Sequence, residues 1–303
     1  MKALKTNYKL TSIASMVALC ALFSCNVDND DTVLQAEASS RSTTARLVPL
    51  DNCTEGARNS VRALDIPNAV NDGKIDDRSC YANYYETKHG DVTYGNYNIA
   101  VNSNHFDANG NGLQPRIERS LVRADSTVGN YVELKGTFRI LEVGDAGNDN
   151  QNGTYIAQAK GQHSKRPGAA TNDGSPDPAI CLFLAKPIYG LDKQGRTTQT
   201  SFNIYREQII TRGGSGRLGR KLVFLKNVKK GHPTNFELKV GFRNNNGEKV
   251  HYANAKIGGQ NFFWNIPEPE RGLQSGIRYG AYRVKGGRAR IQWANTSYVR
   301  VNR

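Results

Sequence analysis

The chain has 303 residues and carries a formal net charge of +14 at pH 7. Three of its positive charges, Lys2, Lys5 and Lys9, lie in the first ten residues, which leaves +11 on the rest. A surplus of this size favours a polyanionic partner, such as a nucleic acid, an anionic membrane or an acidic polysaccharide. The length allows one β-sandwich or barrel as a single domain, and we find no internal repeat or second linker.

Residues 1–24 have the pattern of an export signal. A basic start precedes an apolar run from about residue 10 to residue 23, and the sequence Leu-Phe-Ser-Cys occupies 22–25. The apolar run, at about 14 residues, is too short to favour a bilayer-spanning helix. Leu-x-Ser-Cys resembles a bacterial lipobox, which predicts that Cys25 is the lipidated first residue of the mature protein. An ordinary cleaved signal followed by an incidental cysteine is the alternative.

Residues 25–45 are polar and lack an apolar period, which predicts a flexible tether. The acidic residues Asp28, Asp30 and Asp31 resemble the surface-export signal of Bacteroidetes lipoproteins. We therefore expect an outer-membrane lipoprotein, at the cell surface or facing the periplasm, with a lipid anchor and one folded domain over residues 46–303. Export makes a nucleic acid an unsuitable partner. A monomer is expected.

Three cysteines follow Cys25. Cys53 and Cys80 flank a polar stretch, and an oxidising compartment favours a disulfide between them. Cys181 lies in the apolar sequence AICLFLA, which predicts a buried residue. No Cys-x-x-Cys pair occurs, so the sequence gives little support to a zinc site.

Ten segments have the composition of β-strands, because each is rich in Val, Ile, Tyr, Phe or Thr and is bounded by turn residues. A short helix is expected at 55–64. Closely spaced strands without alternating helices predict an all-β domain, either a β-sandwich or a jelly roll. The predicted strands are 91–101, 131–143, 154–160, 179–190, 201–210, 221–228, 235–242, 249–258, 277–284 and 289–301.

The strand at 277–284 combines cations, tyrosines and a glycine. Because side chains alternate along a strand, Arg278, Gly280 and Tyr282 share one face, and the apolar side chains between them share the other. The apolar face suits the core, and the polar face would form the floor of a cleft. A bare glycine on a strand marks the close approach of a ligand or of another backbone. An edge strand with solvated side chains is the alternative.

The sequence RYGAYRV resembles the carboxy-terminal strand of jelly-roll polysaccharide lyases, a group that includes alginate lyases of family seven and heparin lyase I. Tyr282 falls on their catalytic tyrosine. The resemblance implies a jelly roll, that is, a concanavalin-like sandwich of two antiparallel sheets with a concave cleft. Two further motifs of these lyases occur upstream in the family's order, and the resemblance covers about residues 114–293.

The first upstream motif is Pro-Arg-Ser/Thr-Glu-Leu-Arg, which PRIERSLVR resembles. This register matches Arg116 and Glu118 and puts Arg119 close to the last arginine, although Ile117 replaces the small hydroxyl residue. A rival register over 119–123 matches Arg-Ser-x-Leu/Val-Arg but loses the glutamate. We prefer the first register because it keeps the Pro-Arg pair and Glu118.

The second upstream motif is Gln-x-His, which YIAQAKG resembles. Gln158 matches the glutamine, and Lys160 stands where the histidine is expected. This departure disfavours alginate-type chemistry. His163, three residues further on, could compensate only if the chain bends.

The resemblance implies β-elimination, in which the C5 proton of a uronate is removed and the 4-O-linked sugar is expelled. Arg116 and Gln158 would neutralise the carboxylate and stabilise the enediolate. Tyr282, with a pKa lowered by nearby cations, would act as base and then as acid. Lys160 would neutralise or share the base role. Substrate contacts would come from Arg119, Arg278, Glu118 and His163. The reaction requires no metal and no cofactor.

The carboxy-terminal residues 279–298 are similar to the corresponding part of ulvan lyases of family twenty-eight. Ulvan is a sulfated uronate polymer, and the charge of +11 suits it. Alginate, glucuronan and a sulfated glycosaminoglycan stay open. A non-catalytic surface glycan-binding protein of the same fold is the main alternative. A glycoside hydrolase of the concanavalin type would typically carry Glu-x-Asp-x-x-Glu, and we do not find this pattern.

Two loops allow other interpretations. The segment 107–118, DANGNGLQPRIE, fits the spacing of an EF-hand calcium loop, but it has no flanking helices and contains Pro115. We expect a turn there, with a structural calcium ion as the alternative. The segment RGGSGRLGRK lacks the Gly-Lys-Ser/Thr of a phosphate-binding loop, and we interpret it as a mobile basic loop over the cleft or a plain surface loop.

Overall fold

The computed structural model describes residues 74–76, 82–101, 115–145, 152–168, 179–213, 219–283 and 288–303, all within one compact unit, Ser40–Arg303. The predicted signal, the tether, Cys25, the Cys53–Cys80 pair and the helix at 55–64 lie outside the described residues, as does most of the loop at 107–118. In the described part of the chain, no helix is long and apolar enough to cross a membrane.

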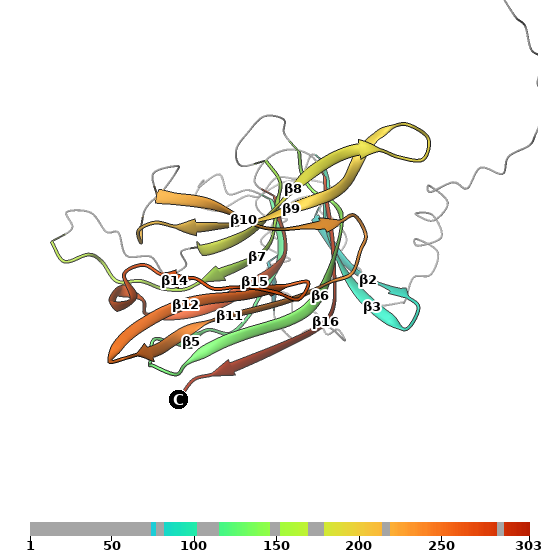
Figure 1. Ribbon diagram of the computed structural model, residues 1–303. Helices are drawn as coiled ribbons and strands as arrows, with labels where there is room; N and C mark the ends of the chain where they lie inside the picture. Colours follow the sequence, from blue (N-terminus) through green and yellow to red (C-terminus); the bar gives the residue numbers. More distant parts are fainter. Residues whose placement is uncertain are drawn as a thin grey trace, which may run out of the picture. The chain divides into compact units, whose positions relative to one another are not determined.

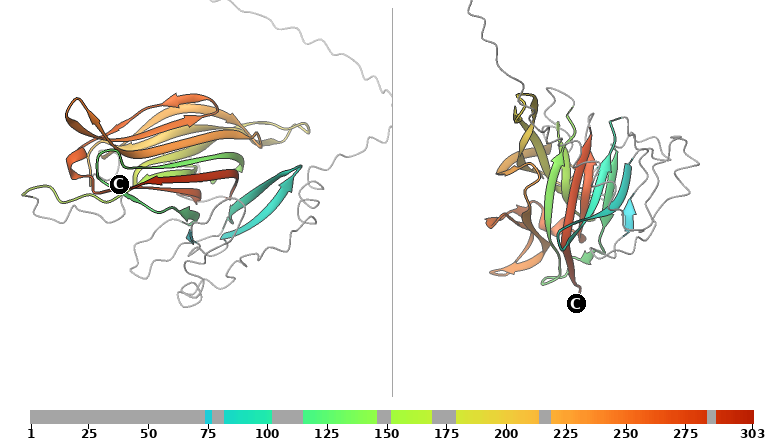
Figure 2. Two further views of the ribbon diagram at one scale, coloured as in Figure 1. Left: turned by 90° about the horizontal axis from the view of Figure 1, so that it is seen from below. Right: turned by 90° about the vertical axis from the view of Figure 1, so that its right-hand side faces the viewer.

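The described residues form two antiparallel sheets of eight strands each, which lie as two layers (Figures 1 and 2). In the first sheet the order is β1-β4-β15-β7-β8-β9-β10, and β5 also pairs with β15. Its bounds are β1 Lys74–Asp76, β4 Arg116–Ser120, β5 Ala124–Asp125, β7 Thr154–Lys160, β8 Ala179–Leu191, β9 Thr197–Ile209, β10 Arg220–Lys229 and β15 Gln274–Arg283.

In the second sheet the order is β13-β12-β11-β6-β16-β3-β2, and β14 also pairs with β12. One short 3₁₀ turn, η1 (Pro269–Arg271), precedes β15. The bounds are β2 Ala82–His89, β3 Val92–Ile99, β6 Tyr131–Glu142, β11 Thr234–Asn245, β12 Glu248–Ile257, β13 Gln260–Phe262, β14 Asn265–Ile266 and β16 Ala289–Val301.

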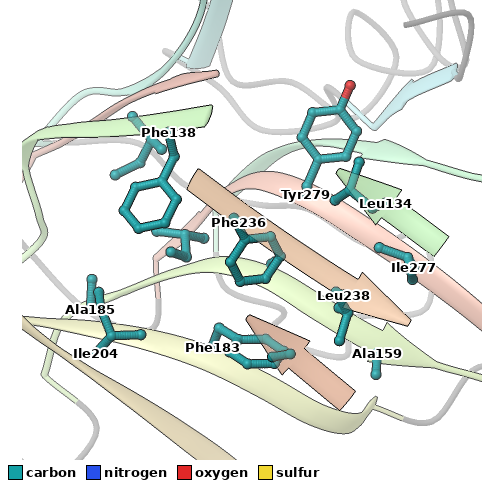
Figure 3. Close-up of a cluster of buried hydrophobic side chains, with 14 of the residues drawn as sticks. Leu134, Phe138, Ala159, Phe183, Ala185, Ile204, Phe236, Leu238, Ile277 and Tyr279 are labelled. Atoms are coloured by element: carbon teal, nitrogen blue, oxygen red, sulfur yellow. The ribbon is translucent and has the colours of Figure 1, made fainter. Parts of the chain in front are cut away.

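The core lies between the sheets, where aromatic side chains of both meet (Figure 3). Phe236 of β11 has ring-centroid distances of 6.1 Å to Phe138 and 5.5 Å to Trp293 in its own sheet, and 5.3 Å to Phe183 of β8 in the other. Edge-to-face contacts of this kind add to the free energy gained by burying the rings. Cys181 is buried in the same core, as predicted, and burial raises the pKa of its thiol to about 12.

All ten predicted strands are confirmed, and the chain is an all-β jelly-roll sandwich. The strands without a prediction are short, apart from β2. Its sequence, ANYYETKH, is largely polar, and among the described strands β2 pairs only with β3, at the end of its sheet. A strand with one neighbour gives little apolar signal, because fewer of its side chains contact the core.

We predict that Phe236→Ala lowers the free energy of unfolding by about 3–5 kcal/mol, because it opens a cavity between the two sheets. Urea unfolding followed by tryptophan fluorescence measures the change. Phe263→Ala is the matched control: Phe263 is 72% exposed, and the same substitution there should cost less than about 0.5 kcal/mol. Equal costs at the two positions would contradict this description of the core.

Candidate active site

Strand β15 lies between β4 and β7 in the first sheet, and this position decides which side chains meet. Arg278 pairs with Ser120 of β4 and Gln158 of β7, while Tyr282 pairs with Arg116 of β4. Paired residues point to the same side of a sheet. The alternate residues of β15 point into the core, where they are at most 1% exposed: Ile277, Tyr279 and Ala281. The predicted division of this strand into two faces is confirmed.

The outer face of these three strands therefore carries a set of polar side chains that we call the polar row. Its centre is tightly connected, since Gln158 Nε2 donates a hydrogen bond to Glu118 Oε1. The other carboxylate oxygen of Glu118 lies 3.9 Å from Arg116 Nη1. The Arg116 guanidinium in turn lies over the Tyr282 ring, 4.4 Å from its centroid. The members of the polar row are Arg116, Glu118, Gln158, Lys160, Arg278 and Tyr282.

Most of the polar row is buried, although it lies on the outer face of the sheet. Glu118 is 0% exposed, Gln158 1%, Arg116 5% and Lys160 7%, whereas Arg278 and Tyr282 are partly exposed. Burying so many polar groups costs free energy unless they are paired, so their concentration makes this face the candidate site. Glu118 was expected to contact substrate. Its burial corrects this, since its carboxylate instead holds Gln158 and Arg116.

The pKa of Tyr282 differs from the sequence-based expectation. We expected nearby cations to lower it, but it is raised above its ordinary value of 10.0, chiefly because the phenol is buried. Arg116 acts in the expected direction and lowers the pKa, whereas the carboxylates of Glu118 and Glu207 raise it. The phenol of Tyr282 is therefore protonated at neutral pH.

The reason for a glycine at position 280 also differs from the one we expected. We expected the bare position to leave room for a sugar. The residue has φ +141, and a Cβ atom there would lie 2.4 Å from the Ile117 carbonyl oxygen and 2.9 Å from the Tyr97 ring. Close approach of another backbone, the other reason for a glycine in a strand, therefore explains this position.

Arg119 does not lie with the other predicted site residues. It pairs with Tyr279 of β15, faces the core and is 0% exposed. Its Nε donates a hydrogen bond to the Tyr97 hydroxyl at 3.0 Å, and its guanidinium lies over the Tyr84 ring. This placement corrects the expectation of a substrate contact, because alternation along β4 puts Arg119 on the opposite face from Arg116 and Glu118.

His163 and the described part of the basic loop are not members of the polar row. His163 follows the end of β7, is 4% exposed and forms an isolated bridge with Gly272. The described part of the loop after β9 includes Arg212, which is 1% exposed and donates to the carbonyl oxygens of Pro267 and Glu268. The loop is thus anchored at Arg212. Within the described residues, no three His, Cys, Asp or Glu side chains are placed to hold a metal ion.

The sequence did not predict a second group on the same outer face. The hydroxyl of Tyr155 donates to Glu207, Arg220 Nη1 lies 3.6 Å from the Glu207 carboxylate, and the Tyr155 ring is 5.3 Å from that of Tyr282. Simple alternation puts Tyr155 in the core. An irregularity between Tyr155 and Ala157 reverses this, so that Tyr155 faces outwards while Ile156 and Ala157 both enter the core.

Comparison with known proteins identifies the family. A family model of the PL28 ulvan lyases matches residues 37–302. An endo-acting ulvan lyase of Formosa agariphila is 58% identical over 256 residues, which make up 83% of this chain and 48% of that protein. Ulvan lyase NLR42 of Nonlabens ulvanivorans is 57% identical over 247 residues, 80% of this chain and 45% of that protein.

The chain spans about half the length of these two curated relatives. Among solved structures, the PL7 alginate lyase AlyA1 from Zobellia galactanivorans is similar, with a TM-score of 0.47 and 13% identity, over 72% of this chain and 81% of that one. The family model covers most of the sequence and includes every member of the polar row, in agreement with the resemblance of residues 279–298. The chain belongs to the PL28 ulvan lyases.

Proposed function

We propose that this chain is a polysaccharide lyase that cleaves an anionic, uronate-containing polysaccharide by β-elimination, with ulvan as the substrate. The observation that carries the proposal is the polar row, which gathers cations, an amide and a phenol on one outer sheet face. Membership of the PL28 ulvan lyases and the names of the two relatives support the choice of ulvan. The surplus of positive charge suits a sulfated uronate polymer.

The first requirement of the reaction is positive charge and hydrogen-bond donors around the uronate carboxylate. The C5 proton is very weakly acidic, so removing it depends on stabilising the enediolate that forms. Arg278 is partly exposed on the outer face, and the planar guanidinium of an arginine can bind a carboxylate through two hydrogen bonds. Gln158 donates one amide hydrogen to Glu118, and its second amide hydrogen can bind the carboxylate. We assign neutralisation to Arg278, Gln158 and Arg116.

The second requirement is a proton donor for the leaving oxygen and a proton acceptor for C5. Tyr282 fits the donor role, since its raised pKa keeps the phenol protonated. We assign the acceptor role to Lys160, because a buried lysine side chain can exist as the neutral amine, which accepts a proton, and because Glu118 has no exposed surface. The second candidate is Tyr282 in both roles, which its cation contact with Arg116 favours.

We also propose that the protein is exported and held at the outer membrane by a lipid on Cys25. This part of the proposal rests on the basic start, the short apolar run and the Leu-Phe-Ser-Cys sequence at 22–25. A tethered lyase at the surface would meet a polymer that is too large to enter the cell. The positive charge of the domain would then attract that polymer.

The wild-type protein should release unsaturated uronate from ulvan, measured by its ultraviolet absorbance. Tyr282→Phe should lower kcat about 100- to 10,000-fold, because the leaving oxygen loses its proton donor. Tyr189→Phe is the matched control, since Tyr189 is 48% exposed on β8. Alginate, glucuronan and heparin complete the panel. Binding of ulvan without unsaturated product on any of the four polymers would favour a non-catalytic glycan-binding protein.

Solvent exchange at C5 separates the two assignments of the base. If Lys160 is the base, Tyr282→Phe should still incorporate deuterium at C5 of ulvan in D₂O, whereas Lys160→Met should lose this exchange. Nuclear magnetic resonance of the recovered polymer measures the deuterium. Lys256→Met, on the other sheet, controls for the loss of one positive charge. Loss of exchange in Tyr282→Phe, with exchange retained in Lys160→Met, would assign both steps to Tyr282.

The pKa of Tyr282 should respond to its two charged neighbours in opposite directions. Arg116→Gln should raise it, because the guanidinium favours the phenolate, and Glu207→Gln should lower it. Alkaline ultraviolet titration of each variant, against the same variant with Tyr282→Phe, isolates this phenol.

The raised pKa of Tyr282 also has a consequence for stability. The protonated phenol stabilises the fold fully below its ordinary pKa of 10.0, and this contribution is lost as pH rises through the raised value. The wild type should therefore lose more stability than Tyr282→Phe above pH 10. An equal loss of unfolding free energy in the wild type and in Tyr282→Phe, measured by urea unfolding, would contradict this electrostatic account. A pKa of Tyr282 that moves in the same direction in Arg116→Gln and Glu207→Gln would also contradict it.

A further inference from the structure

A second, smaller apolar cluster lies on the outer face of the first sheet, separate from the core between the sheets. Its buried members are Tyr155 of β7 and Leu182 and Leu184 of β8, and Tyr282 and Tyr205 pack against it. Leu182 pairs with Gln158, so this cluster is on the same face as the polar row. It forms a continuous surface from Tyr282 on β15 to Tyr205 on β9.

An exposed aromatic residue lies next to the cluster on β10, the last strand of this sheet in the described part of the chain. Phe224 pairs with Tyr205, and their ring centroids are 5.7 Å apart. Tyr205 holds Phe224 on one side, yet Phe224 remains 54% exposed. An exposed ring that is held by a partly buried one offers a fixed flat face, which suits stacking against the apolar face of a sugar ring.

A cation accompanies the two rings. Lys186 follows Leu182 and Leu184 at two-residue steps along β8, so it projects from the same outer face. Its Nζ lies 5.8 Å from the centroid of the Tyr205 ring. Aromatic rings beside an ammonium group suit a sugar that carries a carboxylate or a sulfate, since the rings bind its apolar face and the cation binds the charge.

We propose that Phe224, Tyr205 and Lys186 form a distal subsite, which binds the polysaccharide chain at sugars away from the bond that is cleaved. This rests on the proposed function, and the occupant is the anionic polysaccharide itself. β10 lies three strands from β7, roughly 14 Å away. The apolar cluster connects β7 to Tyr205 on β9, and the contact between the Tyr205 and Phe224 rings continues it to β10. A chain that crosses the strands from the polar row therefore reaches the distal subsite.

The test compares long and short substrates. Phe224→Ala should raise KM for polymeric ulvan roughly three- to tenfold and leave kcat unchanged. The same variant should cleave the shortest cleavable ulvan oligosaccharide like the wild type, because that substrate does not reach β10. Lys186→Met should raise KM for the polymer, and this increase should shrink at high salt, which screens the lost charge interaction. Phe224→Tyr keeps an aromatic ring and should have the wild-type KM. Phe263→Ala, in the connection between β13 and β14, is the matched control. The unfolding midpoint of each variant shows whether the variant folds.

Two results would overturn the distal subsite: an unchanged KM for the polymer in Phe224→Ala, or the same change for polymer and short oligosaccharide. Failure of the proposed function gives a different result, because the wild type would then release no unsaturated uronate. In that case affinity electrophoresis in ulvan gels measures binding directly. Weaker retardation of Phe224→Ala than of Phe263→Ala would support the subsite, and equal retardation or none in the wild type would overturn it.

Discussion

The Glu118 carboxylate has no exposed surface. The side chains that compensate its buried charge also hold the centre of the candidate site together. A buried carboxylate costs several kcal/mol unless charged or donating groups surround it. Gln158 of β7 donates a hydrogen bond to Glu118. Arg116, which precedes Glu118 by two residues on β4, supplies a positive charge. Meeting this requirement orients the amide of Gln158 and brings the Arg116 guanidinium over the Tyr282 ring. Three neighbouring strands are thereby fixed relative to one another.

The same strands also supply the core, which couples the site to the stability of the fold. Ile277 and Tyr279 of β15 pack between the sheets, while Arg278 and Tyr282 project from the outer face. The step from Glu118 to Arg119 crosses from one face to the other, and the Arg119 guanidinium lies inside the core, against the Tyr97 hydroxyl and the Tyr84 ring. A shift of one residue in the register of β4 would exchange these two environments, so core packing fixes the geometry of the polar row.

The strands of the domain and much of the polar row could be predicted, because both follow from local sequence. Alternation along 277–284 was enough to separate Tyr282 from the core, and short motifs pointed to Arg116 and Gln158. Three features could not be predicted, because they depend on tertiary structure. The irregularity beside Ile156 turns Tyr155 outwards, the approach of β4 and Tyr97 explains Gly280, and burial outweighs Arg116 in setting the pKa of Tyr282. The face of Arg119 follows from alternation along β4, but the motif match concealed it.

The central claim is that the outer face of β4, β15 and β7 binds a uronate and positions it for proton transfer. The most direct measurement is a crystal structure of Tyr282→Phe with an ulvan oligosaccharide bound. The account predicts a uronate carboxylate within hydrogen-bonding distance of Gln158 and Arg278, with the glycosidic oxygen facing residue 282. An oligosaccharide bound to the other sheet, or one whose uronate lies away from Gln158 and Arg278, would contradict the account.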